Sequence, residues 1–196
     1  MKVTIDKAFP IAASTEAAWA VLSDVEGVAS CMPGAKITER IDDTHYKGTV
    51  TVKVGPATLS FRGEIEVAGR DAVAKSIHLV AKGTDTTGSS AASMDLTASV
   101  EAADGGASSL KGACETTMSG KAAAFGGRLM NSVADQILEQ FAGNFAVRAA
   151  ASASASAGSA GAASAAPEAP KELNGLALMW AVFKSWLRGL FSRKGA

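Results

Sequence analysis

The side chains of this sequence best suited to bind a transition metal or act as a nucleophile are the cysteines Cys31 and Cys114 and the histidines His45 and His78. The cysteines lie far apart in the chain. They match neither the short repeated spacing of a zinc site nor the framework of a disulfide-rich domain. The histidines are too few and too widely separated to form a metal site, and we expect each on the surface of a strand. These residues therefore predict neither a metal ion nor a disulfide.

Acid–base or covalent catalysis needs further groups in a recognisable arrangement. The sequence shows no Ser–His–Asp set, no paired carboxylates and no phosphate-binding loop. The polar residues that the strand pattern places on an inward face are Cys114, Thr116 and Tyr46. We therefore predict a protein that is not an enzyme.

Cys31 has two interpretations. It opens the run Cys31-Met32-Pro33-Gly34, in which Pro-Gly is a turn signal that ends a helix and starts a strand. A thiol beside such a turn is either exposed and redox-active or small and buried. Burial is favoured, because free cysteines are among the most buried residues.

The elements that must position these groups begin with a strand at residues 3–11 and a short helix N-capped by Ser14 that ends near Asp24. A second short turn covers residues 25–30. From residue 35 to 120 apolar and polar residues alternate with period two, and turns interrupt the pattern. This alternation predicts an antiparallel meander with one covered and one wet face.

A long amphipathic helix is predicted at residues 121–148. Its apolar stripe consists of Phe125, Leu129, Val133, Ile137, Phe141 and Phe145, with Met130, Ala134 and Leu138 beside it. Gly126-Gly127 weakens the start of this helix, so a bend or a close backbone approach is expected there. At 1.5 Å per residue the helix is about 42 Å long, enough to cross a small domain.

The order of elements predicts an α+β fold with two short helices after the first strand, in which a curved antiparallel sheet of about seven strands wraps around a long C-terminal helix. Many inward strand positions are small. Such a sheet either leaves a cavity under the helix or packs closely against it, and both alternatives stay open on the residues alone. The predicted walls of the cavity are Phe125, Leu129, Val133 and Ile137 on the helix and Leu59, Phe61, Met94 and Leu96 on the strands.

Charge is distributed unevenly along the chain. Residues 1–148 carry 14 Lys and Arg against 17 Asp and Glu, a net charge of −3, whereas residues 149–196 carry 5 against 2, a net charge of +3. A weakly acidic body argues against nucleic acid as its partner. The N-terminus has no apolar signal core, so we expect a cytoplasmic protein.

The chain after residue 148 predicts a linker and a second functional segment. Residues 149–172 are rich in Ala, Ser, Gly and Pro, which is typical of a flexible linker, although the alanines favour helix in part of it. Residues 173–196 predict an amphipathic helix that lies on a membrane surface, because its apolar run is too short to span a bilayer. The alternative is a helix that docks on its own domain or on a partner protein. The predicted membrane-binding residues are Trp180, Phe183, Lys184, Trp186, Leu187, Arg188 and Phe191.

Five short motifs occur in order in residues 1–148: Cys31-Met32-Pro33-Gly34, Lys53-Val54-Gly55-Pro56, Phe61-Arg62-Gly63, Gly83-Thr84-Asp85 with Gly88, and Ser119-Gly120 leading to Phe125-Gly126. Together they resemble the CoxG family, named for a subunit of carbon monoxide dehydrogenase. The resemblance implies the START-like, helix-grip fold with an apolar ligand cavity. In that setting the loop at Cys31, Met32, Pro33 and Gly34 is expected near a mouth of the cavity, where it gates entry.

The resemblance also implies a partner, a molybdenum-containing carbon monoxide dehydrogenase or a related molybdenum hydroxylase. The implied role is to carry a respiratory quinone or another lipid between enzyme and bilayer, with peripheral attachment to the inner face of the cell membrane and no covalent cofactor. Two alternatives remain: an adaptor that only recruits the dehydrogenase to the membrane, and an enzyme of the polyketide-cyclase type, which shares the fold.

Overall fold

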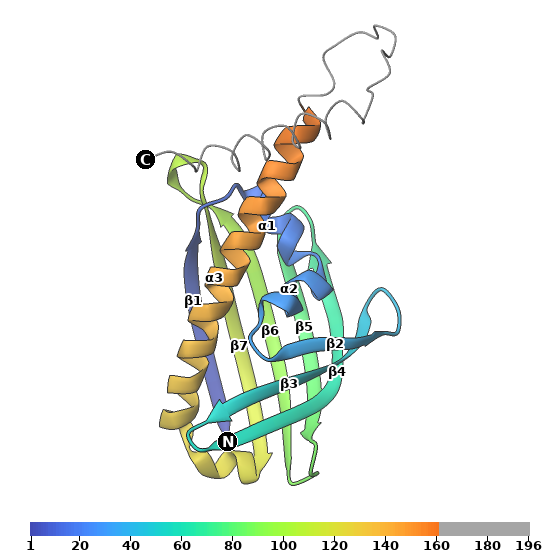
Figure 1. Ribbon diagram of the computed structural model, residues 1–196, viewed down its shortest axis with the longest axis vertical. Coiled ribbons are helices and arrows are strands. Elements are labelled where there is room, and N and C mark those ends of the chain that lie inside the picture. The colour runs from blue at the N-terminus through green and yellow to red at the C-terminus, as the bar shows by residue number, and fades with distance from the viewer. Residues whose placement is uncertain (161–196) are drawn as a thin grey trace, which may run out of the picture. The chain divides into compact units, whose positions relative to one another are not determined.

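The computed structural model describes residues 1–160 and contains seven strands, three α-helices and two short 3-10 turns (Figure 1). The predicted linker beyond residue 160 and the predicted membrane-binding helix lie outside the described residues. In chain order the elements are β1 Lys2–Ile11, α1 Thr15–Leu22, α2 Val25–Cys31, β2 Ala35–Arg40, β3 His45–Val54, β4 Ala57–Asp71, β5 Ser76–Asp85, β6 Ser90–Ala102, η1 Asp104–Gly106, β7 Ser108–Gly120, η2 Lys121–Phe125 and α3 Gly127–Ala160.

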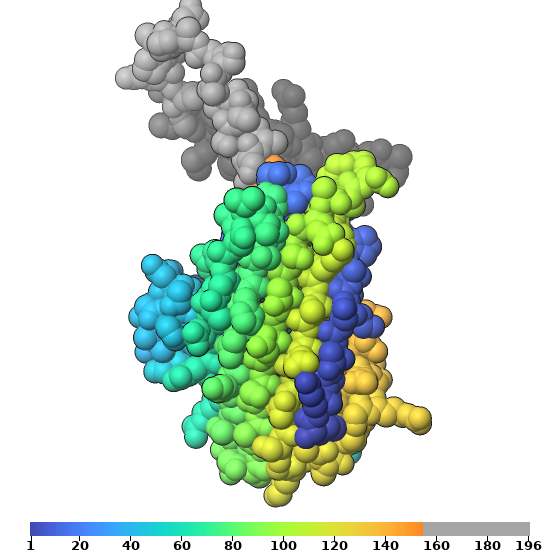
Figure 2. Space-filling view, turned by 180° about the vertical axis from the view of Figure 1, so that it is seen from behind, coloured from blue at the N-terminus to red at the C-terminus, as the bar shows by residue number. Residues whose placement is uncertain are grey.

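All seven strands form one antiparallel sheet in the order β1-β7-β6-β5-β4-β3-β2. Strands β2 to β7 are a meander, and β1 closes the order by pairing with β7. Helix α3 crosses the concave face (Figure 1), whereas no described helix covers the outer face. Figure 2, turned by 180°, shows this outer face. This arrangement confirms the predicted helix-grip fold class.

Strands β4 and β5 approach closely where two glycines face each other. Gly63 pairs with Gly83 across these strands, and a Cβ at Gly63 would collide with the backbone oxygen of Lys82. Only a residue without a side chain permits this approach. The glycine of the Phe61-Arg62-Gly63 motif therefore has a structural role, which is to permit the close approach of β4 and β5.

The two short helices begin at side-chain caps. The Ser14 hydroxyl accepts a 3.2 Å hydrogen bond from the Ala17 amide, as its predicted role as an N-cap requires. Asp24 caps α2 in the same way through a 3.0 Å hydrogen bond from the Gly27 amide. The two short helices predicted after the first strand are thus present, and the second of them ends at Cys31.

The long helix begins and ends later than predicted. Residues Lys121–Phe125 form a 3-10 turn, Gly126 breaks the backbone with a φ of 79°, and α3 starts at Gly127. The bend expected at the two glycines is present. At its other end α3 continues past Arg148 to Ala160, so its 34 residues extend about 51 Å.

The predicted domain boundary at residue 148 is therefore too early. Ala149 is completely buried, and Ala153 packs against the core. Alanine has the highest helix propensity, and its small side chain allows close packing against other elements. The first part of the predicted flexible linker, up to Ala160, is consequently a continuation of the helix.

The core consists of two clusters at the two ends of the sheet. The upper cluster joins α1 and α2 to the second half of α3 and includes Leu22, Phe141 and Phe145, and the two phenylalanine rings lie 5.9 Å apart. The lower cluster is small and contains the buried residues Val3, Met118 and Ala122. Helix α3 also packs against β1, at one edge of the sheet, and against β3, next to the other edge.

Candidate functional site

The concave face between the two clusters is lined by apolar side chains that are only partly buried. We define this middle concave face by residues of β4, β6, β7 and α3, namely Leu59, Phe61, Met94, Leu96, Cys114, Thr116, Val133 and Ile137. Interior side chains in a closely packed core are almost fully buried. Leu59 and Phe61 also pack against the lower cluster and Leu96 against the upper one, so the incompletely packed apolar side chains between the clusters are Met94, Val133 and Ile137.

The register of the sheet explains why these side chains are incompletely covered. One row across the strands runs Ile65, Ala81, Met94 and Thr116, and the next toward the lower end runs Gly63, Gly83, Ala92 and Met118. Five of these eight positions are Gly, Ala or Thr. Small side chains at these positions fill less of the space beneath α3, and the larger Met94 is only partly buried.

Six of the predicted wall residues belong to this face, and two differ in position. Phe125 is the last residue of η2 and not part of α3. Leu129 is 39% exposed, whereas its neighbour Met130 packs against the lower cluster. Each step of four residues rotates a helix position by about 40°, so Leu129 lies about 160° around the helix from the buried Phe145. Met130, which the sequence places beside the i, i+4 stripe, is therefore the residue of this turn that packs toward the sheet.

The polar groups on the middle concave face are a thiol and a hydroxyl. The Cys114 Sγ and the Thr116 Oγ1 lie 3.5 Å apart, and burial raises the pKa of the Cys114 thiol. Tyr46 does not contribute a free hydroxyl, because it donates a 3.2 Å hydrogen bond to the Asp43 carbonyl oxygen. This face can hydrogen-bond one or two ligand oxygens but contains no carboxylate or imidazole among its defining residues.

The predicted gate at residues 31–34 joins α2 to β2. Cys31 is 3% exposed, its thiol donates to the Gly27 carbonyl oxygen at 3.4 Å, and burial raises its pKa. The interpretation of Cys31 as a buried thiol is confirmed. Met32 packs against the upper cluster, and a gating role for this loop stays a prediction.

Asp85 organises the turn between β5 and β6 as a buried carboxylate. It accepts hydrogen bonds from the Thr87 hydroxyl at 2.6 Å, the Ser90 amide at 2.9 Å and the Ser89 hydroxyl at 3.1 Å. These bonds, that from Thr87 foremost, lower its pKa from 3.8 to about 2. Asp85 thus stabilises the turn, and it is only 7% exposed.

The same turn is fastened to the start of the helical segment. The Ser90 hydroxyl accepts a 3.0 Å hydrogen bond from the Ala122 amide, and the Lys121 amide donates to the Ser89 carbonyl oxygen at 3.1 Å. Gly120 has a φ of 70°, and a Cβ there would collide with the Ser89 carbonyl oxygen. Two motifs of the resemblance, far apart in sequence, therefore meet at one end of the sheet.

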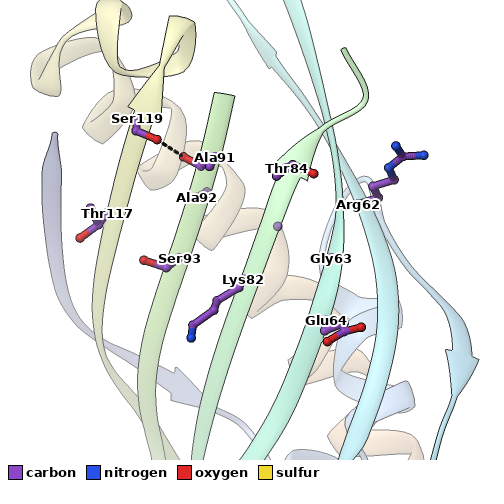
Figure 3. A pocket seen from close by; sticks show the side chains of 11 residues that line it. Arg62, Gly63, Glu64, Lys82, Thr84, Ala91, Ala92, Ser93, Thr117 and Ser119 are labelled. Atoms are coloured by element: carbon purple, nitrogen blue, oxygen red, sulfur yellow. Dashed lines mark hydrogen bonds between the residues drawn. The ribbon is translucent and has the colours of Figure 1, made fainter. Parts of the chain in front are cut away.

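A shallow depression of about 540 Å³ lies on the outer face (Figure 3). Its side chains come mainly from the outward positions of β4 to β7, including Arg62, Glu64, Lys82 and Thr117. In Figure 3 the helices lie behind the sheet. This depression is on the opposite side of the sheet from the predicted apolar cavity, so it is a different feature.

The histidines lie on the surface, as predicted. His78 Nε2 is 2.9 Å from an Asp95 oxygen on the outer face, and His45 contacts Asp42 beside the β2–β3 turn. Within residues 1–160 no group of three or more His, Cys, Asp or Glu side chains is arranged to hold a metal ion. Within the same residues, no helix combines the length and hydropathy that crossing a bilayer requires.

The curved sheet, the helix across it and the partly covered apolar face define a helix-grip protein of the START-like class. Within that class the chain belongs to the CoxG family of carbon monoxide dehydrogenase subunits, whose model matches residues 8–150. No curated protein is significantly similar to the chain in sequence.

Solved structures share the fold at low sequence identity. A conserved protein from Geobacillus kaustophilus superimposes with a TM-score of 0.68 at 19% identity, over 76% of this chain and 97% of that one. The Zhui aromatase/cyclase from Streptomyces sp. R1128 gives 0.55 at 15% identity, over 76% and 94%. A START superfamily protein from Mycobacterium smegmatis gives 0.52 at 16% identity, over 74% and 96%. At these identities the similarity concerns the fold alone.

Proposed function

We propose that the protein is a non-catalytic accessory protein of a molybdenum-containing carbon monoxide dehydrogenase, or of a related molybdenum hydroxylase, and that it binds a respiratory quinone on its concave face. The observation that carries this proposal is the partly buried apolar lining between the two clusters. Family membership supports the partner, because the family is described as a subunit of carbon monoxide dehydrogenase.

A lipid-like ligand fits the chemistry of this face. Transfer of apolar chain out of water is favourable by about 0.8 kcal/mol per CH₂, so an isoprenoid tail favours a sheltered apolar surface. Met94 has the flexibility to adapt to an irregular chain. The Thr116 hydroxyl and the Cys114 thiol share one hydrogen bond, so the proton of the group that accepts it is available to a quinone carbonyl oxygen.

Coupling to the membrane is the second part of the proposal. The segment at residues 173–196 combines Trp and Phe with Lys and Arg, a composition that favours the headgroup region. In this role the protein carries quinone between the bilayer and the enzyme. An adaptor that recruits the enzyme without carrying a ligand is the alternative that the experiment must separate.

Gly112 offers a direct test because it faces α3 from β7. A Cβ built there meets the Leu96 Cδ1 at 3.8 Å, an ordinary contact, so a larger side chain has room to enter the concave face. The wild-type chain, made in a quinone-producing host and extracted with organic solvent, should release a quinone detectable by mass spectrometry. Gly112→Phe should fold and lose the quinone, while Ala113→Phe, which points outward on the same strand, should retain it.

The outcomes separate the two functions. Extraction of phospholipid alone, or of nothing, from the wild-type chain contradicts quinone carriage. If instead the Gly112→Phe chain folds and supports electron transfer from the dehydrogenase to membranes at the wild-type rate, that result indicates recruitment without a ligand.

A further inference from the structure

The lower end of the sheet is built from four segments that the sequence separates widely: residues 1–4, 53–58, 84–92 and 117–131. We call this end the base. Hydrogen bonds connect its parts: the Met1 ammonium donates to the Met118 carbonyl oxygen at 2.6 Å, and the Ala122 amide donates to the Ser90 hydroxyl at 3.0 Å. The β3–β4 turn approaches the start of α3 at the same end (Figure 1).

The base is positively charged although the body as a whole is weakly acidic. Asp85 is the only acidic residue in its four segments, and it is buried and hydrogen-bonded. Lys53, Lys121 and Arg128 are exposed, and none of them forms an ion pair within the described part of the chain. Lys2, the remaining cation, is paired with Glu115 at 2.9 Å.

Apolar side chains lie among these cations. Leu129, next to Arg128, is 39% exposed, and Phe125 is partly buried at the end of η2. Cations beside exposed apolar side chains are typical of surfaces that rest in the headgroup region of a bilayer. An acidic protein surface would complement the cations but would not require the apolar side chains.

We propose that the base is a docking surface for an anionic lipid bilayer. This inference rests on the proposed function, and it specifies which end of the fold meets the membrane. The lower cluster closes the concave face at this end, and partly buried side chains such as Leu59, Phe61 and Met130 pack against its buried residues. Docking here places the bilayer at the end of the concave face where these partly buried apolar side chains lie.

The test uses the full chain with a single reporter at each end. In a Cys114→Ser background, an environment-sensitive fluorophore is attached at Ala124→Cys in the base or at Val73→Cys in the β4–β5 turn at the opposite end. Ala124 is exposed and Val73 is 95% exposed, so both positions are accessible, while Cys31 is buried. The probe is a quinone-free vesicle of phosphatidylcholine, with or without phosphatidylglycerol, that carries a headgroup-level quencher.

We expect quenching of the Ala124 reporter on vesicles with phosphatidylglycerol, loss of that quenching in high salt, and no quenching at Val73. Each cation near an anionic surface contributes about 1 kcal/mol, so removing three weakens docking of the base by about 100-fold. Lys53→Glu/Lys121→Glu/Arg128→Glu should therefore abolish quenching at Ala124. The matched control is Lys36→Glu/Arg70→Glu/Lys82→Glu, which changes net charge equally at exposed positions outside the base and should retain it.

Quenching that is equal at both reporters, absent at Ala124 or independent of phosphatidylglycerol would overturn the proposal. So would a charge-reversed base that loses binding to the dehydrogenase but keeps quenching on vesicles, since the base would then dock on protein. If the triple variant does not fold, the salt and lipid dependence of the wild-type reporters still decides the outcome. Because the vesicles contain no quinone, failure here is distinct from failure of quinone binding.

Discussion

The side-chain amide of Asn144 on α3 donates a 2.9 Å hydrogen bond to the backbone carbonyl of Cys31, the last residue of α2. The last carbonyls of a helix have no partner within the helix, so this bond satisfies one of them from a distant element. Arg148, one turn further along α3, reinforces the junction through a 3.2 Å ion pair with Asp24. The Cys31–Gly34 loop is therefore attached to α3 at its first residue, where α2 ends.

Replacing Asn144 with Ala should lower the free energy of unfolding by about 1 kcal/mol, the typical contribution of one such hydrogen bond. Urea denaturation followed by circular dichroism measures the change. Gln140→Ala, at an exposed position one turn earlier, is the control and should have a much smaller effect. Equal losses in the two variants would show that the bond to Cys31 does not stabilise the junction.

Because the core extends beyond residue 148, substitutions of two adjacent alanines should differ sharply in their effect on stability. Ala149 is fully buried, whereas Ala150 is exposed. Ala149→Asp buries a carboxylate without a partner and should destabilise the fold by about 3 kcal/mol or more, while Ala150→Asp should change stability by less than about 0.5 kcal/mol. Thermal unfolding of the two variants measures the difference, and similar melting temperatures would place Ala149 in a linker after all.

Asp85 should make stability depend on pH in an acidic window. Its pKa in the folded protein is about 2, below the 3.8 of the ordinary carboxyl, so the unfolded chain binds more protons between these values. The stabilisation from the ionised Asp85 is thus complete above about pH 4 and is lost as the pH falls through about 2. Wild type should be more stable than Asp85→Asn at pH 7, and the difference should shrink toward pH 2.

Denaturant midpoints measured at several pH values test this expectation. Asp104→Asn is a suitable control, because the exposed Asp104 side chain makes no hydrogen bond in the described structure. A difference between wild type and Asp85→Asn that stays constant from pH 7 to pH 2 would contradict the assignment of the three hydrogen bonds to the ionised carboxylate.

Cys114 offers a chemical probe of the concave face. Burial raises its pKa, so its reactive thiolate should form at a higher pH than that of a free cysteine. A maleimide should therefore label Cys114 slowly near pH 7 and faster as the pH rises, and added quinone should slow labelling by covering the thiol. Mass spectrometry of the modified peptide measures both rates, with Cys31→Ser as the background. Labelling that quinone does not affect would place the ligand away from Cys114.

Local patterns accounted for much of the fold. The alternation in residues 35–120 predicts the strands of the meander, and Ser14 predicts the start of α1, because strand faces and helix caps depend on residues close together in sequence. The same reasoning placed Met94 and Leu96 on one face of β6. It did not place Leu129, because a run of i, i+4 positions rotates gradually away from the face that packing selects.

Residue patterns along the chain were thus enough to predict the order of the elements, the inward face of each strand and the weak points at Gly126-Gly127. Folding in three dimensions determined which side of α3 is covered, that the core extends to Ala149, and that Asp85, Ser90 and Ala122 form one hydrogen-bonded junction. It also brought Lys53, Lys121 and Arg128 to one end of the fold. The physical reason is that caps and alternation act over a few residues, whereas burial and charge clustering depend on contacts between segments that only folding brings together.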